Sequence, residues 1–158
     1  MEILTPDFRY HKPALDLVYS SKPDIFSHNI ECVKRISKSV RRNSDWDRTL
    51  NVLKHAVDNG MLTKTGMMVG LGETDEEVFE AMKFTRSIGV EIFNIGQYLQ
   101  PTIKHLPVDR YVEPEIFSLY KNYGLKIGFK VVESGPLVRS SYHADQQARL
   151  YNKNSLTF

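Results

Sequence analysis

The chain has 158 residues, of which 41% are hydrophobic and 25% are charged, with a formal net charge of +2. These values argue against a disordered or membrane-spanning chain, and the length suits one domain but is short for a complete barrel enzyme of ~250 residues. The N-terminal run MEILTPDFRYHK lacks the basic-then-apolar order of a signal peptide. We therefore expect a cytoplasmic location, or a mitochondrial or plastid one in a eukaryote, and no membrane partner.

Charge and cysteine content narrow the classes of function further. The densest basic run, KRISKSVRR at 34–42, has no aromatic residues between its basic ones on which bases could stack. Nucleic-acid binding is therefore not expected, while a solvated helix face and an acidic partner both remain open. Cys32 is the only cysteine, which excludes internal disulfides and any multi-cysteine metal site made by this chain alone.

Strand-like and helix-like segments alternate along the first half of the chain. The pattern predicts a strand within 23–31, a helix over 44–60 with Ser44 as a candidate cap, and a strand over 64–73. Thr74 and Glu77 have the spacing of a capping box for a helix through Ser87, and Gly89 is well placed to end it.

The alternation continues to the C-terminal region. A buried strand is predicted over 90–99, a helix from Pro114 to about Asn122 that Gly124 closes, and a strand over 126–134. Such alternation predicts βαβ units with right-handed crossovers and a parallel sheet, either open or curved into part of a barrel.

Polar or glycine-rich residues follow each predicted strand, where parallel α/β folds bind their ligands. In SHNIE, Asn29 and Glu31 share a side in extended chain and offer an amide and a carboxylate, although a helix cap with an acidic first turn explains them equally well. In GMMVGLGE, the glycines at 66, 70 and 72 allow either close ligand approach or close packing of strand and helix. In GQYLQP, an exposed backbone edge could pair with a purine ring.

The last polar segment, GPLVRSSYHAD, contains Arg139, Ser140 and Ser141 ahead of a predicted helix. Helix capping by a serine is one interpretation. A serine oxygen could instead bind a metal centre, and Arg139 could hold a carboxylate. His143 and Asp145 suggest a hydrolase triad, but no G-x-S-x-G turn accompanies them.

Several long strings, taken together, resemble lipoyl synthase, a radical S-adenosylmethionine enzyme, across nearly the whole chain. They are TPDF, HNIE, VRR, TKTGMMVGLGET, IGQYLQPTIKHLPVDRYVEPEIF and GFKVVESGPLVRSSYHADQ. The resemblance implies an α/β fold in which parallel βα repeats form the C-terminal part of a partial TIM-type (β/α)6 barrel. It also implies a single domain, with barrel over about 1–134 and a cluster-capping segment over about 135–158.

The resemblance further implies a reaction and its partners. One [4Fe-4S] cluster would cleave S-adenosylmethionine to a radical that removes hydrogen atoms at C6 and C8 of an octanoyl-lysine. A second, auxiliary [4Fe-4S] cluster would donate the two sulfur atoms. The octanoyl-lysine belongs to a lipoyl carrier domain, either a 2-oxoacid dehydrogenase E2 or the glycine cleavage H protein.

Site residues follow from the resemblance position by position, and no catalytic residue is assigned. Ser141 matches the oxygen ligand of the auxiliary cluster, with Arg139 and Ser140 around it. The expected S-adenosylmethionine contacts are Asn29, Glu31 and Arg41 near the methionyl and ribose groups, and Gly70, Gly72, Glu73, Gln97, Tyr98 and Leu99 beside the cofactor and its adenine.

Two departures from the family pattern matter. Cys32 stands in HNIECV where the family usually has threonine. Both cysteine triplets of the family, C-x-x-x-C-x-x-C and C-x-x-x-x-C-x-x-x-x-x-C, would lie upstream of this chain. We therefore expect a C-terminal portion that is inactive alone and associates with a missing N-terminal half. The alternative is a non-catalytic half-barrel that binds a lipoyl carrier domain or S-adenosylmethionine.

Overall fold

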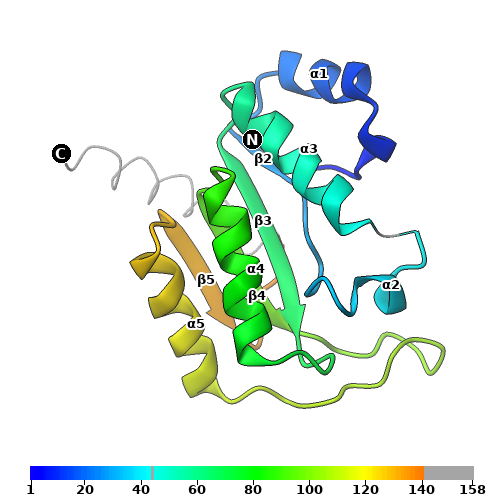
Figure 1. The fold of residues 1–158 in the computed structure, drawn as a ribbon, viewed down its shortest axis with the longest axis vertical. Coiled ribbons are helices and arrows are strands. Elements are labelled where there is room, and N and C mark those ends of the chain that lie inside the picture. The colour runs from blue at the N-terminus through cyan, green and yellow to red at the C-terminus, as the bar shows by residue number, and fades with distance from the viewer. Residues whose placement is uncertain (44, 141–158) are drawn as a thin grey trace.

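The fold is built on five parallel strands. A computed structural model describes residues 1–43 and 45–140. The strands lie in the sheet in chain order, β1-β2-β3-β4-β5, and every neighbouring pair is parallel (Figure 1). Their bounds are Glu2–Leu4, Ile25–Ser27, Thr63–Val69, Ile92–Gln97 and Val131–Gly135. The parallel sheet predicted from the alternation of strand and helix patterns is confirmed.

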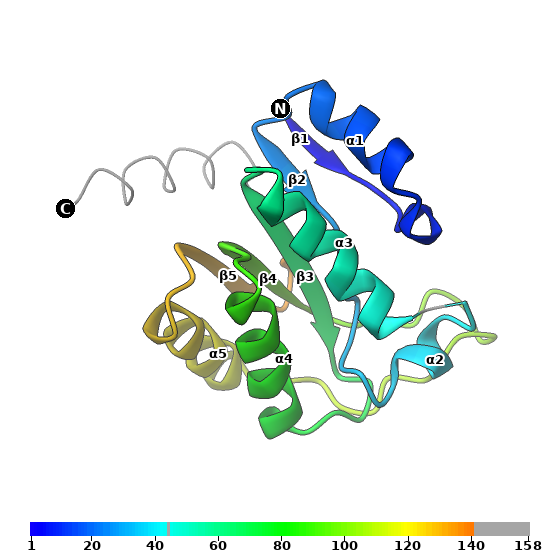
Figure 2. The same ribbon diagram turned by 45° about the horizontal axis from the view of Figure 1, so that its top comes forward.

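Helices connect the strands and gather on one face of the sheet. Figures 1 and 2 show α3, α4 and α5 side by side over that face. The elements are a 3₁₀ turn η1 (Phe8–Tyr10) and the helices α1 (Lys12–Ser20), α2 (Ser37–Val40), α3 (Trp46–Asp58), α4 (Asp75–Ser87) and α5 (Pro114–Lys126). Helices on one face leave the other face free for a barrel interior, as the expected partial barrel requires.

The two faces of the sheet differ because side chains alternate along each strand. Val69, Phe93 and Val132 face the helices and join the main core, together with the buried side chains Leu53, Val78, Met82, Phe117 and Tyr120. Fully burying one such side chain contributes about 1.5–3 kcal/mol. The alternate positions, which include Gly66, Met68, Asn94 and Gly96, face the opposite side, and this is the side where the site lies.

Local signals set the helix ends as the sequence predicts. The Thr74 hydroxyl accepts the Glu77 backbone N–H and the Glu77 carboxylate accepts the Thr74 N–H, so the capping box is present. Gly89 follows α4 with φ +101°, a conformation that suits glycine. Asp45 caps α3 by accepting the Arg48 N–H, and the candidate cap Ser44 lies outside the described residues.

The predicted end of the last helix is wrong. The helix α5 runs on to Lys126, and Gly124 is a buried residue inside it. A Cβ at Gly124 would lie 2.6 Å from Met82 Cε and 2.8 Å from a Val132 methyl group, so the glycine allows close packing against α4 and β5. Gly128, with φ +102°, follows the true end, and the next strand starts five residues later than predicted, at 131 rather than 126.

Two elements near the N-terminus have no counterpart in the sequence interpretation. These are β1 and α1, of which α1 packs Leu15 and Tyr19 against Phe26 of β2. The basic run at 34–42 forms only the four-residue helix α2. Among the described helices, none has the length and apolar composition needed to cross a membrane.

Candidate functional site

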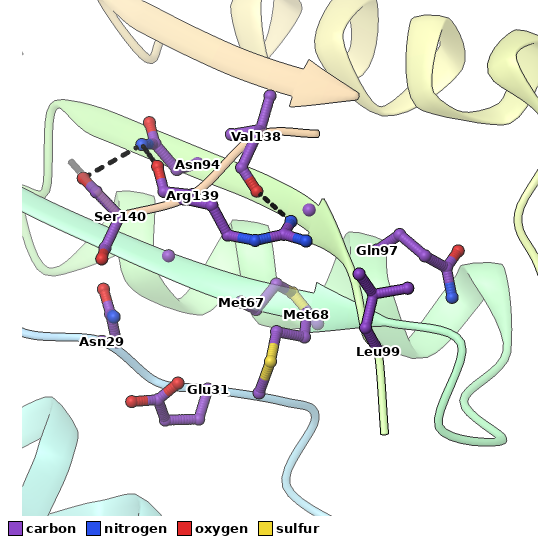
Figure 3. Close-up of a pocket in the computed structure, with 12 residues that line it drawn as sticks. Asn29, Glu31, Met67, Met68, Asn94, Gln97, Leu99, Val138, Arg139 and Ser140 are labelled. Carbon is purple, nitrogen blue, oxygen red and sulfur yellow. Dashed lines mark hydrogen bonds between the residues drawn. The ribbon is translucent and has the colours of Figure 1, made fainter. Parts of the chain in front are cut away.

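A pocket of about 200 Å³ opens at the carboxyl ends of β2, β3 and β4 (Figure 3). We call it the central pocket. It is lined by Asn29, Glu31, Gly66, Met67, Met68, Asn94, Gly96, Gln97, Leu99, Val138, Arg139 and Ser140. The structure therefore brings together the predicted residues of the SHNIE, GQYLQP and GPLVRSSY segments, which are far apart in the sequence.

Asn29 provides a free acceptor on one wall of the pocket. Its Oδ1 is buried and has no hydrogen-bond partner among the described residues. Gly66 lies opposite it on β3, and a Cβ there would come within 3.3 Å of that oxygen. A buried carbonyl oxygen without a partner costs stability, so the arrangement suits a ligand that donates a hydrogen bond.

Glu31 sits beside Asn29 in a left-handed backbone conformation, with φ +67°. Its N–H donates to the Gly66 carbonyl at 3.2 Å and its carbonyl accepts the Met68 N–H at 2.8 Å, so the segment after β2 is bound to β3. Left-handed geometry costs a non-glycine residue roughly 1–2 kcal/mol and is found at functional sites. Figure 3 shows Asn29 and Glu31 facing Ser140 and Arg139 across the pocket.

Arg41 lies next to the central pocket rather than in it. Its Nη2 is 3.0 Å from Glu31 Oε1, and it lines a neighbouring hollow of about 420 Å³, the Arg41 hollow, which shares Asn29 and Glu31 with the central pocket. His28 and Thr5 line the same hollow, and His28 Nδ1 donates to the Thr5 carbonyl at 2.9 Å. Burial lowers the pKa of His28, so its Nε2, which has no partner among the described residues, is an acceptor.

The glycines and glutamate of the VGLGE turn lie behind the pocket wall. Glu73 is buried, and its carboxylate accepts the N–H groups of Gly70 at 2.7 Å and Leu71 at 2.9 Å. Gly70 and Gly72 have φ near +100°, which the turn requires. Gly70, Gly72 and Glu73 shape the turn and do not line the central pocket. Their contact with a cofactor stays a prediction.

Gln97 and Tyr98 use their side chains to hold the loop at 98–113. The Gln97 amide donates to the carbonyl of Arg110 at 3.0 Å and accepts the Val112 N–H at 2.9 Å. The Tyr98 hydroxyl donates to the Leu106 carbonyl at 2.8 Å. Only Leu99 of the predicted trio turns a half-exposed side chain to the pocket. The cofactor contact predicted at 97–99 would therefore be made by the backbone and by Leu99.

Residues 136–140 cross the open face of the sheet as a strap. The Asn94 amide donates to the Arg139 carbonyl at 3.1 Å, and a Cβ at Gly96 would lie only 2.2 Å from the Val138 carbonyl oxygen. Arg139 turns its guanidinium back onto the carbonyls of Pro136 and Val138. Ser141, the predicted cluster ligand, lies outside the described residues.

Asn94 is a polar residue of the candidate site that the sequence interpretation missed. It holds the strap and lines the central pocket, yet in VEIFNIGQYL it reads as one polar residue within a buried strand. Period-two alternation places Asn94 on the same face as Gly96, and that spacing could have identified it.

Comparisons with known proteins identify the family of this chain. The sequence profile described as the Radical SAM superfamily matches residues 1–85, more than half of the chain. The chain belongs to the radical SAM superfamily. It is 49% identical over 158 residues to a lipoyl synthase of Rubrobacter xylanophilus, covering 99% of this chain and 49% of that protein.

Other lipoyl synthases give the same result. The chain is 51% identical over 152 residues to the Bacteroides fragilis enzyme and 49% identical over 146 residues to that of Treponema denticola. These matches cover 96% and 92% of this chain, and 53% and 50% of the two relatives. This radical SAM chain is therefore a homologue of lipoyl synthase that spans about half the length of the curated relatives it matches.

The radical SAM superfamily implies iron–sulfur clusters, which need three or four thiolates each. Cys32 is the only thiol in the chain, and it is 1% exposed within the main apolar core. Burial, with the nearby carboxylates of Glu31 and Glu73, raises its pKa to about 12. Within residues 1–43 and 45–140, no three His, Cys, Asp or Glu side chains are grouped to hold a metal ion. The described residues do not fit a cluster.

Proposed function

We propose that this chain contributes the βα units of β1–β5 to a lipoyl synthase barrel and binds S-adenosylmethionine in the central pocket. The observation that carries the proposal is the acceptor pair at the end of β2, the unpartnered Asn29 Oδ1 and the Glu31 carboxylate. Both groups accept hydrogen bonds, which suits the ribose hydroxyls and the ammonium group of that cofactor. The identity of about half over nearly the whole chain supports the same ligand.

S-adenosylmethionine, when bound, supplies the radical chemistry of the superfamily. The residues of this chain bind and orient it. Gly66 leaves room beside Asn29, and Met68 and Leu99 give apolar surface that excludes water. The side chains of Glu73 and Gln97 bond to backbone groups of the turn and of the loop that shape the pocket wall.

The proposed substrate is an octanoyl-lysine on a lipoyl carrier domain, which becomes a lipoyl group with sulfur from an auxiliary cluster. Because Cys32 is the only thiol and is buried, the cluster thiolates must come from a polypeptide segment that this sequence does not include. We propose that the chain alone is inactive and works together with a cysteine-bearing N-terminal half.

Ligand binding tests the pocket assignment. Ligand-observed NMR with S-adenosylhomocysteine measures affinity without any cluster. Replacing Asn29 by alanine removes one hydrogen bond of about 0.5–1.5 kcal/mol, so we expect affinity to fall by roughly twofold to tenfold. Asn122→Ala, at an exposed position on α5, is the matched control. Equal affinity of the two variants would contradict the assignment.

Anaerobic reconstitution with iron and sulfide tests the cluster assignment. We expect no stoichiometric [4Fe-4S] absorbance from this chain, and a full cluster spectrum would overturn the proposal. The single buried cysteine equally favours a second candidate, a non-catalytic module that binds the cofactor or the carrier. Adding a polypeptide with both cysteine motifs separates the two, because turnover then appears only if the chain is half of an enzyme.

A further inference from the structure

The turn η1 holds an arginine in a costly conformation. Phe8, Arg9 and Tyr10 all have positive φ, at 46°, 51° and 59°. Such geometry costs roughly 1–2 kcal/mol per non-glycine residue, so the surroundings must impose it. Phe8 and Tyr10 pack against the apolar cluster between α1 and α3, and the Arg9 N–H donates to Asp7 Oδ1 at 2.9 Å. The turn therefore partly buries its two aromatic residues and leaves the Arg9 side chain exposed.

A hollow of about 420 Å³ opens beside this turn, and we call it the Arg9 hollow. It is lined by Asp7, Arg9, Arg42, Asn43, Asp45 and Arg48. Arg48 is already committed, because its Nε lies 2.6 Å from Asp7 Oδ2 and its Nη2 donates to the Asn43 carbonyl at 2.8 Å. Burial alone raises the pKa of Asp7, but hydrogen bonds from the Arg9 N–H and Arg48 hold it below its ordinary value, so Asp7 stays charged.

Arg9 and Arg42 are the two arginines of this hollow that have no acidic partner among the described residues. Both are exposed, and neither forms an ion pair or a side-chain hydrogen bond with a described residue. The three arginines face two aspartates, both of which lie near Arg48. The hollow is therefore positive, and its two free guanidinium groups suit carboxylates.

The Arg9 hollow adjoins the Arg41 hollow, which in turn adjoins the proposed cofactor site. It shares Asp7 and Asn43 with the Arg41 hollow, and the Arg41 hollow shares Asn29 and Glu31 with the central pocket. The three hollows follow one another along the carboxyl ends of β3, β2 and β1. A ligand at Arg9 and Arg42 would thus lie at the far end of a row of depressions that starts at the cofactor.

We propose that the Arg9 hollow is the docking point for an acidic surface patch of the protein that carries the substrate, with Arg9 and Arg42 as its contacts. This inference rests on the proposed function, in which the substrate is a lysine arm on a folded carrier domain. The carrier's carboxylates pair with the two free arginines while its arm reaches along the hollows to the central pocket. A nucleic acid fits less well, because two free arginines between Asp7 and Asp45 do not form the extended basic stripe that a run of phosphates needs.

Isothermal titration of the full chain with a purified lipoyl domain, unacylated and octanoylated, tests the proposal. The variant Arg9→Gln/Arg42→Gln removes two exposed charges without removing a described hydrogen bond. The matched control Lys83→Gln/Lys126→Gln removes two exposed charges from α4 and α5. We expect about a tenfold loss of affinity for both carrier forms in the arginine variant alone, and a weaker salt dependence.

Each outcome has a separate meaning. Equal losses in the two double variants, or no loss in either, would overturn the docking site, as would no binding of either carrier form by the unmodified chain. An octanoyl group that adds no affinity would instead count against the substrate in the proposed function. If the arginine variant loses the same affinity for the carrier with and without the octanoyl group, docking at Arg9 and Arg42 is supported independently of that substrate.

Discussion

Gly96 controls how the strap at 136–140 sits over the central pocket, and Gly96→Ala should displace it. The new Cβ would lie 2.2 Å from the Val138 carbonyl oxygen, whereas a carbon and a carbonyl oxygen normally need about 3.3 Å. The strap must therefore move by about 1 Å, and the Asn94 hydrogen bond to the Arg139 carbonyl is weakened or lost. Overpacking of this kind costs about 1–3 kcal/mol.

Gly135 is the matched control for this prediction, because it pairs with Gly96 in register across β4 and β5. A Cβ at Gly135 meets its nearest heavy atom, a Val138 methyl carbon, at 3.6 Å, which is an ordinary contact. Replacing either glycine stiffens the unfolded chain, which stabilises by ~0.4–1 kcal/mol and cancels in the comparison. We therefore expect Gly96→Ala to be about 1–3 kcal/mol less stable than Gly135→Ala in urea denaturation.

Hydrogen exchange provides the second measurement for Gly96→Ala. We expect the amide of Val138, which donates to the Gly135 carbonyl, to exchange faster in that variant than in the control. Equal stability of the two variants, together with equal exchange rates at Val138, would show that the close approach of the strap to β4 does not require a glycine at position 96.

Three further predictions concern buried or partly buried groups. Glu2→Gln removes the carboxylate that lies 3.0 Å from the buried Lys64 ammonium, so we expect the free energy of unfolding to fall by about 3 kcal/mol. Adding Lys64→Met should restore this stability. A double-mutant cycle in urea that shows no recovery would contradict the prediction. Burial alone raises the pKa of Asp75, but the hydrogen bond from Arg110 holds this pKa below its ordinary value. The charged Asp75 therefore stabilises the fold at neutral pH, and this contribution is lost below about pH 4. In denaturation measured against pH, Asp75→Asn should reduce the loss of stability in acid. Burial raises the pKa of Cys32 to about 12, against about 8.5 for a free thiol. We therefore expect alkylation at neutral pH to be at least a hundredfold slower than in the unfolded chain, and rapid native labelling would show the thiol to be accessible.

Local chemistry explains which parts of the fold could be predicted. The capping box at Thr74 and Glu77 and the stop at Gly89 depend on residues within a few positions of each other, and both are present as expected. Gly124 was misinterpreted because its role is set by Met82 and Val132, which reach it only through the tertiary fold. A glycine inside a helix and a glycine at its end look alike until the neighbouring elements are in place.

The site could be predicted to the level of segments but not of side chains. Asn29 and Leu99 were expected near a ligand and line the central pocket. Glu73 and Gln97 were assigned to the same ligand, but their polar atoms bond to the backbone of the turn and of a loop more than ten residues away. Position at a strand end identifies such residues, whereas the direction of each side chain depends on contacts that the sequence does not display.

Two unfavourable features lie at the carboxyl end of β2, beside the central pocket. At the amino ends, Ile25, Ile92 and Val131 form a closed apolar cluster. At the carboxyl ends, Glu31 has a left-handed backbone and Asn29 Oδ1 lacks a described partner. Unpaired buried acceptors and strained residues lower stability, and a ligand that pairs with them returns that free energy as affinity. Binding of the proposed ligand at this end of the sheet should therefore raise the unfolding free energy of the chain.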